Sequence, residues 1–227
     1  MVRVGITQGD INGIGSEVII KALLDPAICE LCTPVVFGSN KTMSYHRKTM
    51  GIEDFNFNIV RDINNLNPKR PNLFNIYEEE VNIELGKSTE TGGKYALKSL
   101  EAACEALENA KIDTLVTAPI NKHNIQSESF KFPGHTEYLE KRFGNVKGLM
   151  MLCSDALRVG VVTGHIPVVN IFASLSTEKI YSKIKTINKS LKEDFGITKP
   201  KIAVMGLNPH AGDNGTIGNE ELEMIVP

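Results

Sequence analysis

Three of the five histidines stand in turns where a side chain can reach a ligand. His135 lies in F-P-G-H-T-E, His165 in T-G-H-I-P and His210 in G-L-N-P-H-A-G. Each has a glycine within one or two positions, which allows close approach of a ligand to the backbone. The segments before His165 and His210 are strand-like, and α/β proteins bind ligands in the loops after strands. These histidines are therefore the first candidates for chemistry.

His165 and His210 are candidate metal ligands. Neutral imidazole is a common ligand of zinc and similar divalent metals, and the ligands of one site often come from separate loops. A usable site normally has a third protein ligand. The other two histidines, His46 in Y-H-R-K and His123 in a short loop, are not in a matching setting. The alternative is that these are ordinary loop histidines.

A glycine-rich loop, T-Q-G-D-I-N-G-I-G-S-E at residues 7–17, joins an expected strand to an expected helix. Backbone N–H groups at the start of such a helix can hold an anion. The loop is not the dinucleotide fingerprint, because the third glycine is missing after Gly13-x-Gly15 and no acidic residue ends the next strand. A Rossmann cofactor site is therefore not expected. A ligand role for this loop and a purely structural tight turn both stay open.

Other polar residues carry weaker signals. Lys122 ends T-A-P-I-N-K, just beyond a strand-like run, and is either a point charge for a phosphate or carboxylate or a solvated loop lysine. Asp213 is interpreted as a residue that caps a turn rather than one that orients a metal ligand. Cys29 and Cys32 form a C-x-x-C with no second pair, which favours a structural role over half of a zinc or redox site.

The elements that must position these residues alternate along the whole chain. Strand-like apolar runs separated by amphipathic stretches predict α/β layers with a largely parallel sheet. Strands are expected at residues 2–7, 33–38, 57–60, 72–77, 115–117, 148–153, 157–163 and 202–206. Helices are expected at residues 16–24, 41–50, 91–110, 136–143, 179–195 and from 219 onward. A polar break near 124–131 suggests a first α/β domain at residues 1–130 and a second, with the metal histidines, at residues 131–227.

The composition argues against several classes of protein. The 227 residues are 41% hydrophobic with a formal net charge of −2 and no long run of one sign, so we do not expect nucleic-acid binding. No apolar stretch is long enough for a membrane span, and the N-terminus lacks the apolar core of a secretory signal, so the cytoplasm is the expected location. The chain has no G-x-S-x-G elbow and no P-loop lysine motif, which argues against serine hydrolase and NTPase chemistry.

Together the motifs resemble those of the 4-hydroxythreonine-4-phosphate dehydrogenase family, which serves vitamin B6 synthesis. T-Q-G-D-I-N-G-I-G-S-E, T-A-P-I-N-K, F-P-G-H-T-E, T-G-H-I-P and G-L-N-P-H-A-G occur in the family's order, and the last is close to diagnostic. The resemblance runs from about Arg3 to Pro227. The first motif also resembles a turn of isocitrate and isopropylmalate dehydrogenases, so the resemblance implies their α/β/α layers in two domains, which is not a Rossmann fold.

The resemblance also implies roles for particular residues. His165 and His210 match two of the family's three metal-ligand histidines, and His135 and Thr136 match its substrate-binding pair. The third histidine and the later substrate-binding Lys, Asn and Arg lie further along family chains, and the family's active site forms at the interface of a homodimer. Because residues 220–227 begin a helical pattern without a capping glycine, we expect the chain to be cut short, with the completion of the first domain missing.

The reaction implied is oxidation of 4-phosphooxy-L-threonine by NAD or NADP, with decarboxylation to 3-amino-2-oxopropyl phosphate. A divalent metal such as zinc, cobalt or magnesium is expected to stabilise negative charge on the substrate alcohol. Three alternatives stay open. They are an inactive fragment of such an enzyme, a phosphate acyltransferase-like enzyme of the same general fold, and a dehydrogenase for another phosphorylated hydroxy acid.

Overall fold

The computed structural model describes residues 1–144 and 147–227 and divides the chain into two compact units, Met1–Phe143 and Gly144–Pro227. The division falls after helix α5 (His135–Arg142) rather than near residue 130, where the sequence suggested a boundary. Packing explains this position, because Tyr138 of α5 stacks on Phe130 with ring centroids 5.3 Å apart. Each unit is described by itself below.

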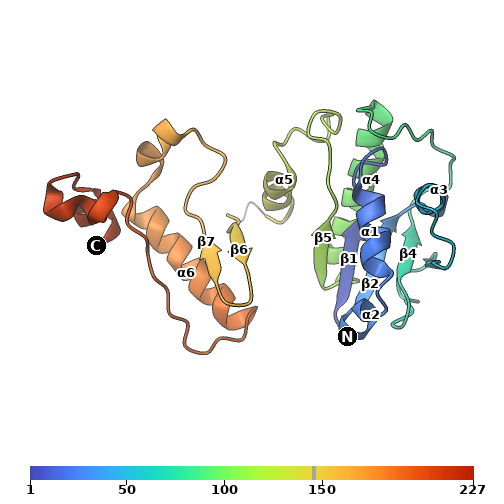
Figure 1. The fold of residues 1–227 in the computed structure, drawn as a ribbon, viewed down its shortest axis with the longest axis horizontal. Coiled ribbons are helices and arrows are strands. Elements are labelled where there is room, and N and C mark those ends of the chain that lie inside the picture. Colours follow the sequence, from blue (N-terminus) through green and yellow to red (C-terminus); the bar gives the residue numbers. More distant parts are fainter. Residues whose placement is uncertain (145–146) are drawn as a thin grey trace. The chain divides into compact units, whose positions relative to one another are not determined.

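The first unit is built on a five-stranded parallel sheet in the order β3-β4-β2-β1-β5 (Figure 1). The expected parallel α/β fold is thereby confirmed for this unit. Buried apolar runs such as T-P-V-V-F-G in β2 suit a central parallel strand, which is covered on both faces. The strands are β1 (Arg3–Thr7), β2 (Thr33–Gly38), β3 (Asn58–Val60), β4 (Asn72–Asn75) and β5 (Thr114–Thr117).

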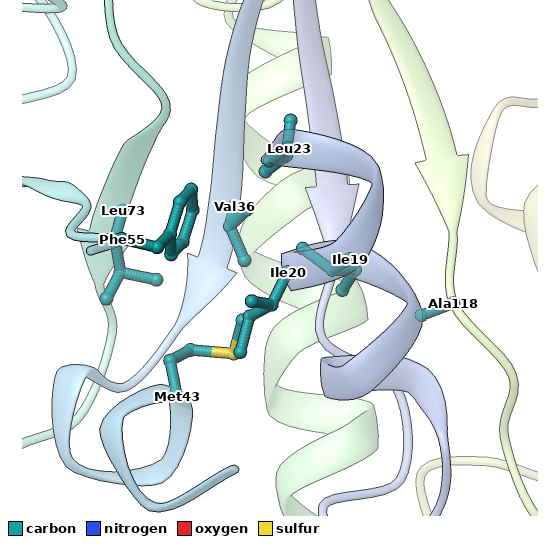
Figure 2. Close-up of a cluster of buried hydrophobic side chains, with 8 residues drawn as sticks. All are labelled: Ile19, Ile20, Leu23, Val36, Met43, Phe55, Leu73 and Ala118. Carbon is teal, nitrogen blue, oxygen red and sulfur yellow. The ribbon is translucent and has the colours of Figure 1, made fainter. Parts of the chain in front are cut away.

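Helices cover both faces of this sheet. Val36 of β2 packs in one cluster with residues of α1 and α3, whereas its neighbours Val35 and Phe37 pack in another cluster with residues of α4. This alternation is the side-chain period of a strand, and it yields three layers. Figure 2 shows the first of these clusters, with Met43 reaching toward Ile20. The helices are α1 (Gly15–Leu23), α2 (Ile28–Leu31), α3 (Asn40–Thr49), α4 (Glu90–Glu108) and α5.

The strand order changes direction at β1. From β1 the chain moves through β2 toward β4 on one side, and β5 is added on the other side. Ligands of open α/β sheets bind at such a switch point, between the loops that leave the carboxyl ends of the two strands. The loops after β1 and β5 are therefore the place to look for a site in the first unit.

The second unit has less regular structure. A two-stranded antiparallel pair, β6 (Met151–Cys153) and β7 (Arg158–Gly160), packs against helix α6 (Thr177–Glu193). The contact is close, since a Cβ built on Gly160 would lie 2.6 Å from Ile187 Cδ1. Ser176 caps α6 by accepting a hydrogen bond from the Lys179 N–H. The remaining helical turns are short: η1 (Val168–Asn170), η2 (Phe172–Ser174), η3 (Pro209–Gly215) and η4 (Glu221–Ile225).

Some expectations from the sequence are wrong in the second unit. The run at residues 202–206 forms no strand, because no other strand of the described residues pairs with it, and Met205 within it is 85% exposed. The strand expected at 157–163 stops at Gly160, and the helix expected from 219 is the single π-turn η4. The pair β6–β7 is antiparallel. In the first unit, the short helix α2 was not expected.

Among the described residues, no helix is long and apolar enough to cross a membrane.

Candidate functional site

The loop that follows β1 is fixed by a buried amide. Gln8 is 1% exposed, and its backbone N–H donates to Ser99 Oγ at 2.8 Å. Its side-chain Oε1 accepts from the Ser39 N–H at 3.3 Å and from the Tyr77 hydroxyl at 3.2 Å. One side chain thereby joins the loops after β1, β2 and β4. Because buried polar groups are costly when unpaired, this network fixes the carboxyl edge of the sheet.

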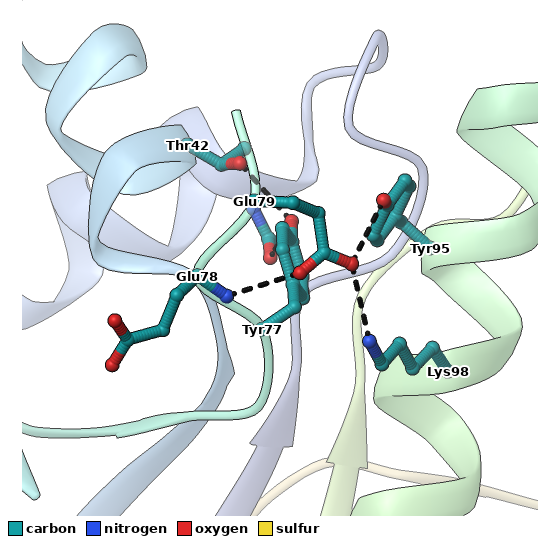
Figure 3. A network of polar contacts seen from close by, with 7 residues as sticks. Thr42, Tyr77, Glu78, Glu79, Tyr95 and Lys98 are labelled. Atoms are coloured by element: carbon teal, nitrogen blue, oxygen red, sulfur yellow. Dashed lines mark hydrogen bonds and ion pairs between the residues drawn. The ribbon is translucent and has the colours of Figure 1, made fainter. Parts of the chain in front are cut away.

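The segment after β4 closes over this network (Figure 3). The Tyr77 hydroxyl also lies 3.0 Å from Thr42 Oγ1, and burial raises the pKa of Tyr77 to about 12. Glu79 accepts from the Tyr95 hydroxyl at 3.0 Å and pairs with Lys98 of α4 at 3.3 Å. A backbone N–H and then the Tyr95 hydroxyl, both hydrogen-bonded to the carboxylate, hold the pKa of Glu79 down at about 2. The ionised Glu79 thus connects the segment to α4.

The loops after β1 and β5 meet at the switch point. The Asp10 N–H donates to the Pro119 carbonyl at 3.0 Å, and the Asp10 carboxylate accepts from Asn124 Nδ2 at 2.8 Å. Gly9 has a φ of +72°, and a Cβ there would overlap the Pro119 carbonyl oxygen. A glycine is required at this position because the two loops approach so closely. The segment that continues from Pro119 carries Lys122.

Lys122 and His135 lie together at the start of α5. A Cβ built on Gly134, the N-cap of α5, would lie 3.6 Å from Lys122 Cε and 3.9 Å from Lys122 Nζ. His135 is the first residue of the helix, and its Nε2 is buried without a hydrogen-bond partner among the described residues. Burial, and then the charge of Lys122, lower the pKa of His135 below its ordinary value of 6.5.

The electrostatics of this corner, which is formed by Lys122, His135 and the start of α5, favour an anion. No side chain of the described residues caps α5, so the N–H groups of its first turn remain available, and the helix dipole adds positive charge there. Across residues 1–144 and 147–227, no carboxylate pairs with Lys122 within ion-pair distance. Thr136, the second residue of the helix, is exposed. An ammonium, a helix start and an imidazole nitrogen without a partner among the described residues thus converge beside the switch point, where the Glu137 carboxylate also faces Gly134.

A second hollow of the first unit lies apart from this corner. It has a volume of about 690 Å³ and runs between α4 and the segment Asn124–Ser129. Its charged lining has both signs, with Lys94 and Lys98 against Glu79 and Glu101. Such a lining does not select an anion, and neither Lys122 nor His135 contributes to it.

The two candidate metal histidines lie in the second unit, on exposed turns. His165 has a φ of +55° and His210 a φ of +51°, so both adopt the left-handed conformation that non-glycine residues rarely occupy. Their expected place at the ends of neighbouring strands is wrong, since residues 202–206 form no strand. The segments Val161–Thr163 and Val204–Leu207 nevertheless line one apolar cavity of about 280 Å³. Both histidines therefore follow segments that lie close together.

The turn that carries His210 is unusual along its whole length. Residues 210–214 all have positive φ, from +45° at Asp213 to +79° at Gly212. Each non-glycine residue in this conformation costs about 1–2 kcal/mol, so the surroundings must stabilise the turn. The Glu221 carboxylate accepts hydrogen bonds from the backbone N–H groups of Leu207 and Asn208. The Asn208 N–H is the main cause of a lowered pKa of Glu221.

The described residues contain no group of three or more His, Cys, Asp or Glu side chains arranged to hold a metal. The donors present, two exposed imidazoles on turns of the second unit, have the chemistry of ligands for a divalent metal. Cys29 and Cys32 are both free thiols, and burial is the first cause of a raised pKa in each, which keeps them protonated.

Several residues that organise these sites did not stand out in the sequence. His46 faces inward from α3, 4% exposed, and its Nε2 lies 2.8 Å from the Ile11 carbonyl. Its spacing of three from the buried Met43 was the available signal, because the two lie on one helical face. Gln8, Tyr77 and Glu221 gave no such signal, since their partners lie far away in the sequence or on irregular turns.

A parallel α/β sheet whose loops gather polar and basic groups at a switch point defines a ligand-binding α/β protein. The family model described as "Pyridoxal phosphate biosynthetic protein PdxA" matches residues 30–227. The chain belongs to this family.

Individual relatives agree with that assignment. A 4-hydroxythreonine-4-phosphate dehydrogenase from Bacteroides thetaiotaomicron is 50% identical over 227 residues, which are 100% of this chain and 62% of the relative. A protein of Oceanobacillus iheyensis, provisionally named D-threonate 4-phosphate dehydrogenase, is 32% identical over 99% of this chain and 68% of its own length. The crystal structure of a 4-hydroxythreonine-4-phosphate dehydrogenase from Burkholderia phymatum superposes with a TM-score of 0.87 at 31% identity, covering 100% of this chain and 69% of that one.

Proposed function

We propose that the chain belongs to an enzyme that oxidises 4-phosphooxy-L-threonine with NAD or NADP and decarboxylates the product to 3-amino-2-oxopropyl phosphate. The observation that carries this proposal is the 50% identity over the whole chain to a relative named for that dehydrogenase activity. The chain spans 62% of that relative's length, so activity is proposed for the enzyme rather than for these residues alone.

The corner at the start of α5 is proposed to bind the substrate. The substrate carries a phosphate and a carboxylate, and Lys122, the N–H groups of the first turn and His135 Nε2 can each contact an anionic or hydroxyl oxygen. Because the pKa of His135 is lowered, its imidazole is neutral near pH 7 and can either donate or accept one hydrogen bond. Thr136 is proposed to bind the substrate with a hydroxyl that both donates and accepts.

His165 and His210 are proposed to hold a divalent metal such as zinc, cobalt or magnesium. When bound, such a metal supplies Lewis-acid stabilisation of the negative charge that develops on the substrate oxygen. The nicotinamide supplies the hydride acceptor. The two histidines contribute imidazole nitrogens as ligands, and their exposed turns leave room for a substrate. A homodimer with its active site at the interface is also proposed.

A second candidate is oxidation of another phosphorylated hydroxy acid. The relative from Oceanobacillus iheyensis, provisionally named for D-threonate 4-phosphate, supports this alternative. Both substrates carry the phosphate and a hydroxyl. They differ at the carbon beside the carboxylate, which bears an amine in 4-phosphooxy-L-threonine and a hydroxyl in D-threonate 4-phosphate. The corner around Lys122 recognises anionic groups, which both substrates carry, so it does not discriminate between them.

The test compares three proteins: this chain, the full-length Bacteroides relative, and a chimera that continues this chain with the relative's remaining segment. Metal content and NAD or NADP reduction are measured with 4-phosphooxy-L-threonine and with D-threonate 4-phosphate. We expect the relative and the chimera to bind a divalent metal and to turn over the first substrate. His165→Ala and His210→Ala in the chimera should each abolish metal binding and activity.

Other outcomes would change the assignment. A chimera that prefers D-threonate 4-phosphate would establish the second candidate. A chimera that is fully active after removal of metal, or indifferent to both histidine substitutions, would show that the metal-dependent mechanism is wrong. Size-exclusion chromatography with light scattering on the same samples tests the homodimer.

A further inference from the structure

Glu221 is a buried carboxylate that accepts three hydrogen bonds from one turn. It is 5% exposed, and its Oε1 accepts from the Leu207 N–H at 2.8 Å and from the Asn208 N–H at 2.6 Å. Its Oε2 accepts from Asn208 Nδ2 at 3.0 Å. No cation of the described residues pairs with it within ion-pair distance. The carboxylate is thus satisfied by the backbone and one amide of the segment that leads into His210.

That segment needs such an anchor. After Pro209, residues 210–214 run through consecutive left-handed conformations, which persist only where the surrounding structure stabilises them. The carboxylate contacts both sides of the turn. A Cβ built on Gly206 would lie 3.5 Å from Glu221 Oε1, and one built on Gly212 would lie 3.0 Å from Glu221 Oε2. The two glycines flank His210 and leave space for the same side chain.

We propose that Glu221 is the positioning residue of the His210 turn, holding the segment Gly206–Gly212 so that the imidazole of His210 is presented in one orientation. Two backbone N–H groups and one amide N–H point at this side chain, so three donors need an acceptor. A carboxylate has only acceptors, whereas a glutamine has one oxygen and one NH₂ group. In Glu221→Gln the new NH₂ group therefore faces the side-chain NH₂ group of Asn208, so that two donors meet without an acceptor. The side chain keeps almost the same size.

The proposed role in metal binding rests on the proposed function, whereas the role in ordering the turn does not. The experiment therefore has two readouts. Amide hydrogen exchange of Leu207 and Asn208 is measured by NMR on this 227-residue chain without metal, and Co²⁺ binding is measured by titration calorimetry on the chimera described above. Glu223→Gln is the matched control, because Glu223 stands on the same turn with an exposed side chain.

In Glu221→Gln we expect exchange at Leu207 and Asn208 to be about tenfold faster, because the anchored turn opens more often. Removing a partner that orients a metal ligand typically weakens binding about 10- to 100-fold, so Co²⁺ affinity should fall by that amount. Glu223→Gln should match the wild type in both readouts. Asn208→Ala, which removes one of the three donors and keeps both backbone N–H groups, should give a smaller loss of affinity.

Exchange at Leu207 and Asn208 that stays at the wild-type rate in Glu221→Gln would overturn the proposal. If Glu221→Gln loses the circular dichroism of α6, the Asn208→Ala arm decides, with Glu220→Ala as its control because the Asn208 amide also donates to Glu220 Oε2. Exchange at Leu207 that is faster in Asn208→Ala than in Glu220→Ala supports the anchor, and equal rates overturn it. If the unsubstituted chimera binds no Co²⁺, or if His165→Ala and His210→Ala leave its affinity unchanged, the metal role in the proposed function fails. The exchange rates still decide whether Glu221 orders the turn.

Discussion

The side-chain amide of Asn124 donates a 2.8 Å hydrogen bond to the carboxylate of Asp10, which lies 114 residues earlier in the chain. The other carboxylate oxygen of Asp10 accepts from the Asn12 N–H at 2.9 Å. One side chain thus shapes the loop after β1 and fixes the segment after β5. Since that segment carries Lys122, the Asp10–Asn124 pair also positions the proposed anion-binding corner.

Asp10→Ala should destabilise the first unit. Asp10 is 6% exposed, so its removal leaves the Asn12 N–H and the Asn124 amide as donors without an acceptor. Each buried donor left unpaired costs about 1–3 kcal/mol of unfolding free energy. Urea unfolding followed by tyrosine fluorescence measures the loss, since the chain has no tryptophan. The exposed Asp54→Ala is the control, and equal midpoints for the two variants would contradict the prediction.

Tyr77→Phe should cost less than the loss of Asp10. The substitution removes a hydroxyl that donates to Gln8 Oε1 at 3.2 Å and lies 3.0 Å from Thr42 Oγ1. Because Gln8 Oε1 keeps the Ser39 N–H as a donor, we expect a loss of about 1–2 kcal/mol in the same urea unfolding measurement. Tyr45→Phe changes an exposed tyrosine and should be neutral. Wild-type stability in Tyr77→Phe would mean that the Gln8 network contributes little.

A spectroscopic measurement checks Tyr77 independently. Burial raises its pKa to about 12, so it should ionise well above the ordinary tyrosine value of 10 in an ultraviolet titration. Tyr77→Phe should remove this late step from the titration curve. A substitution that removes a step near pH 10 instead of the late step would show that the Tyr77 hydroxyl is open to solvent.

The first unit could be predicted from the sequence because its signals are local. The run T-P-V-V-F-G is continuous and apolar, and it forms β2 over the expected residues. Helix α4 has a regular apolar spacing and a capping Thr89, whose hydroxyl accepts from the Gly92 N–H. Burial and capping act over a few residues, so such patterns determine where an element begins and ends. Gln8 and Asp10 were not found because partners such as Tyr77 and Asn124 lie far away in the sequence.

The second unit shows where local patterns fail. The residues at 202–206 have the sequence pattern of a strand. A strand forms only where a neighbouring strand provides backbone hydrogen-bond partners, and no strand of the described residues pairs with this segment. His165 and His210 were singled out by their glycine-flanked turns, and both residues have left-handed φ values there. Glu221 could not be found in advance, because it acts through N–H groups of an irregular turn.

Gly93→Ala should destabilise the packing of α4 against the segment after β5. A Cβ on Gly93 would overlap the Asn124 carbonyl oxygen and approach the Ile125 nitrogen within 2.8 Å, so backbone would have to move. Overpacking of this kind costs about 1–3 kcal/mol or more. Gly164→Ala is the control, since a Cβ there meets no heavy atom within 4 Å and should change stability by less than about 0.5 kcal/mol. Thermal unfolding of both variants distinguishes them, and equal melting temperatures would contradict the prediction.

Lys122→Met should raise the pKa of His135. Burial is the larger cause of the lowered pKa and remains in the variant, whereas the repulsion from the Lys122 ammonium is lost. A pH titration of the His135 ring by NMR measures the change, with the exposed Lys141→Met on the same helix as control. Glu137, whose Oε2 would lie 3.6 Å from a Cβ on Gly134, also faces this corner and is unchanged in both variants.

The sign of the stability effect follows from the same shift. Folding favours the neutral imidazole of His135, because the folded-state pKa lies below the ordinary value of 6.5. The contribution of His135 to stability is therefore fully present above pH 6.5. It is lost as the pH falls from 6.5 toward the lowered pKa of the folded state. With Lys122→Met the loss of stability on acidification should be smaller, since the folded-state and unfolded-state pKa values of His135 move closer together.

Added inorganic phosphate should raise the His135 pKa in the wild type and less in Lys122→Met, because an anion at the α5 start offsets the ammonium. A His135 titration insensitive to both phosphate and Lys122→Met would mean that this corner does not bind anions.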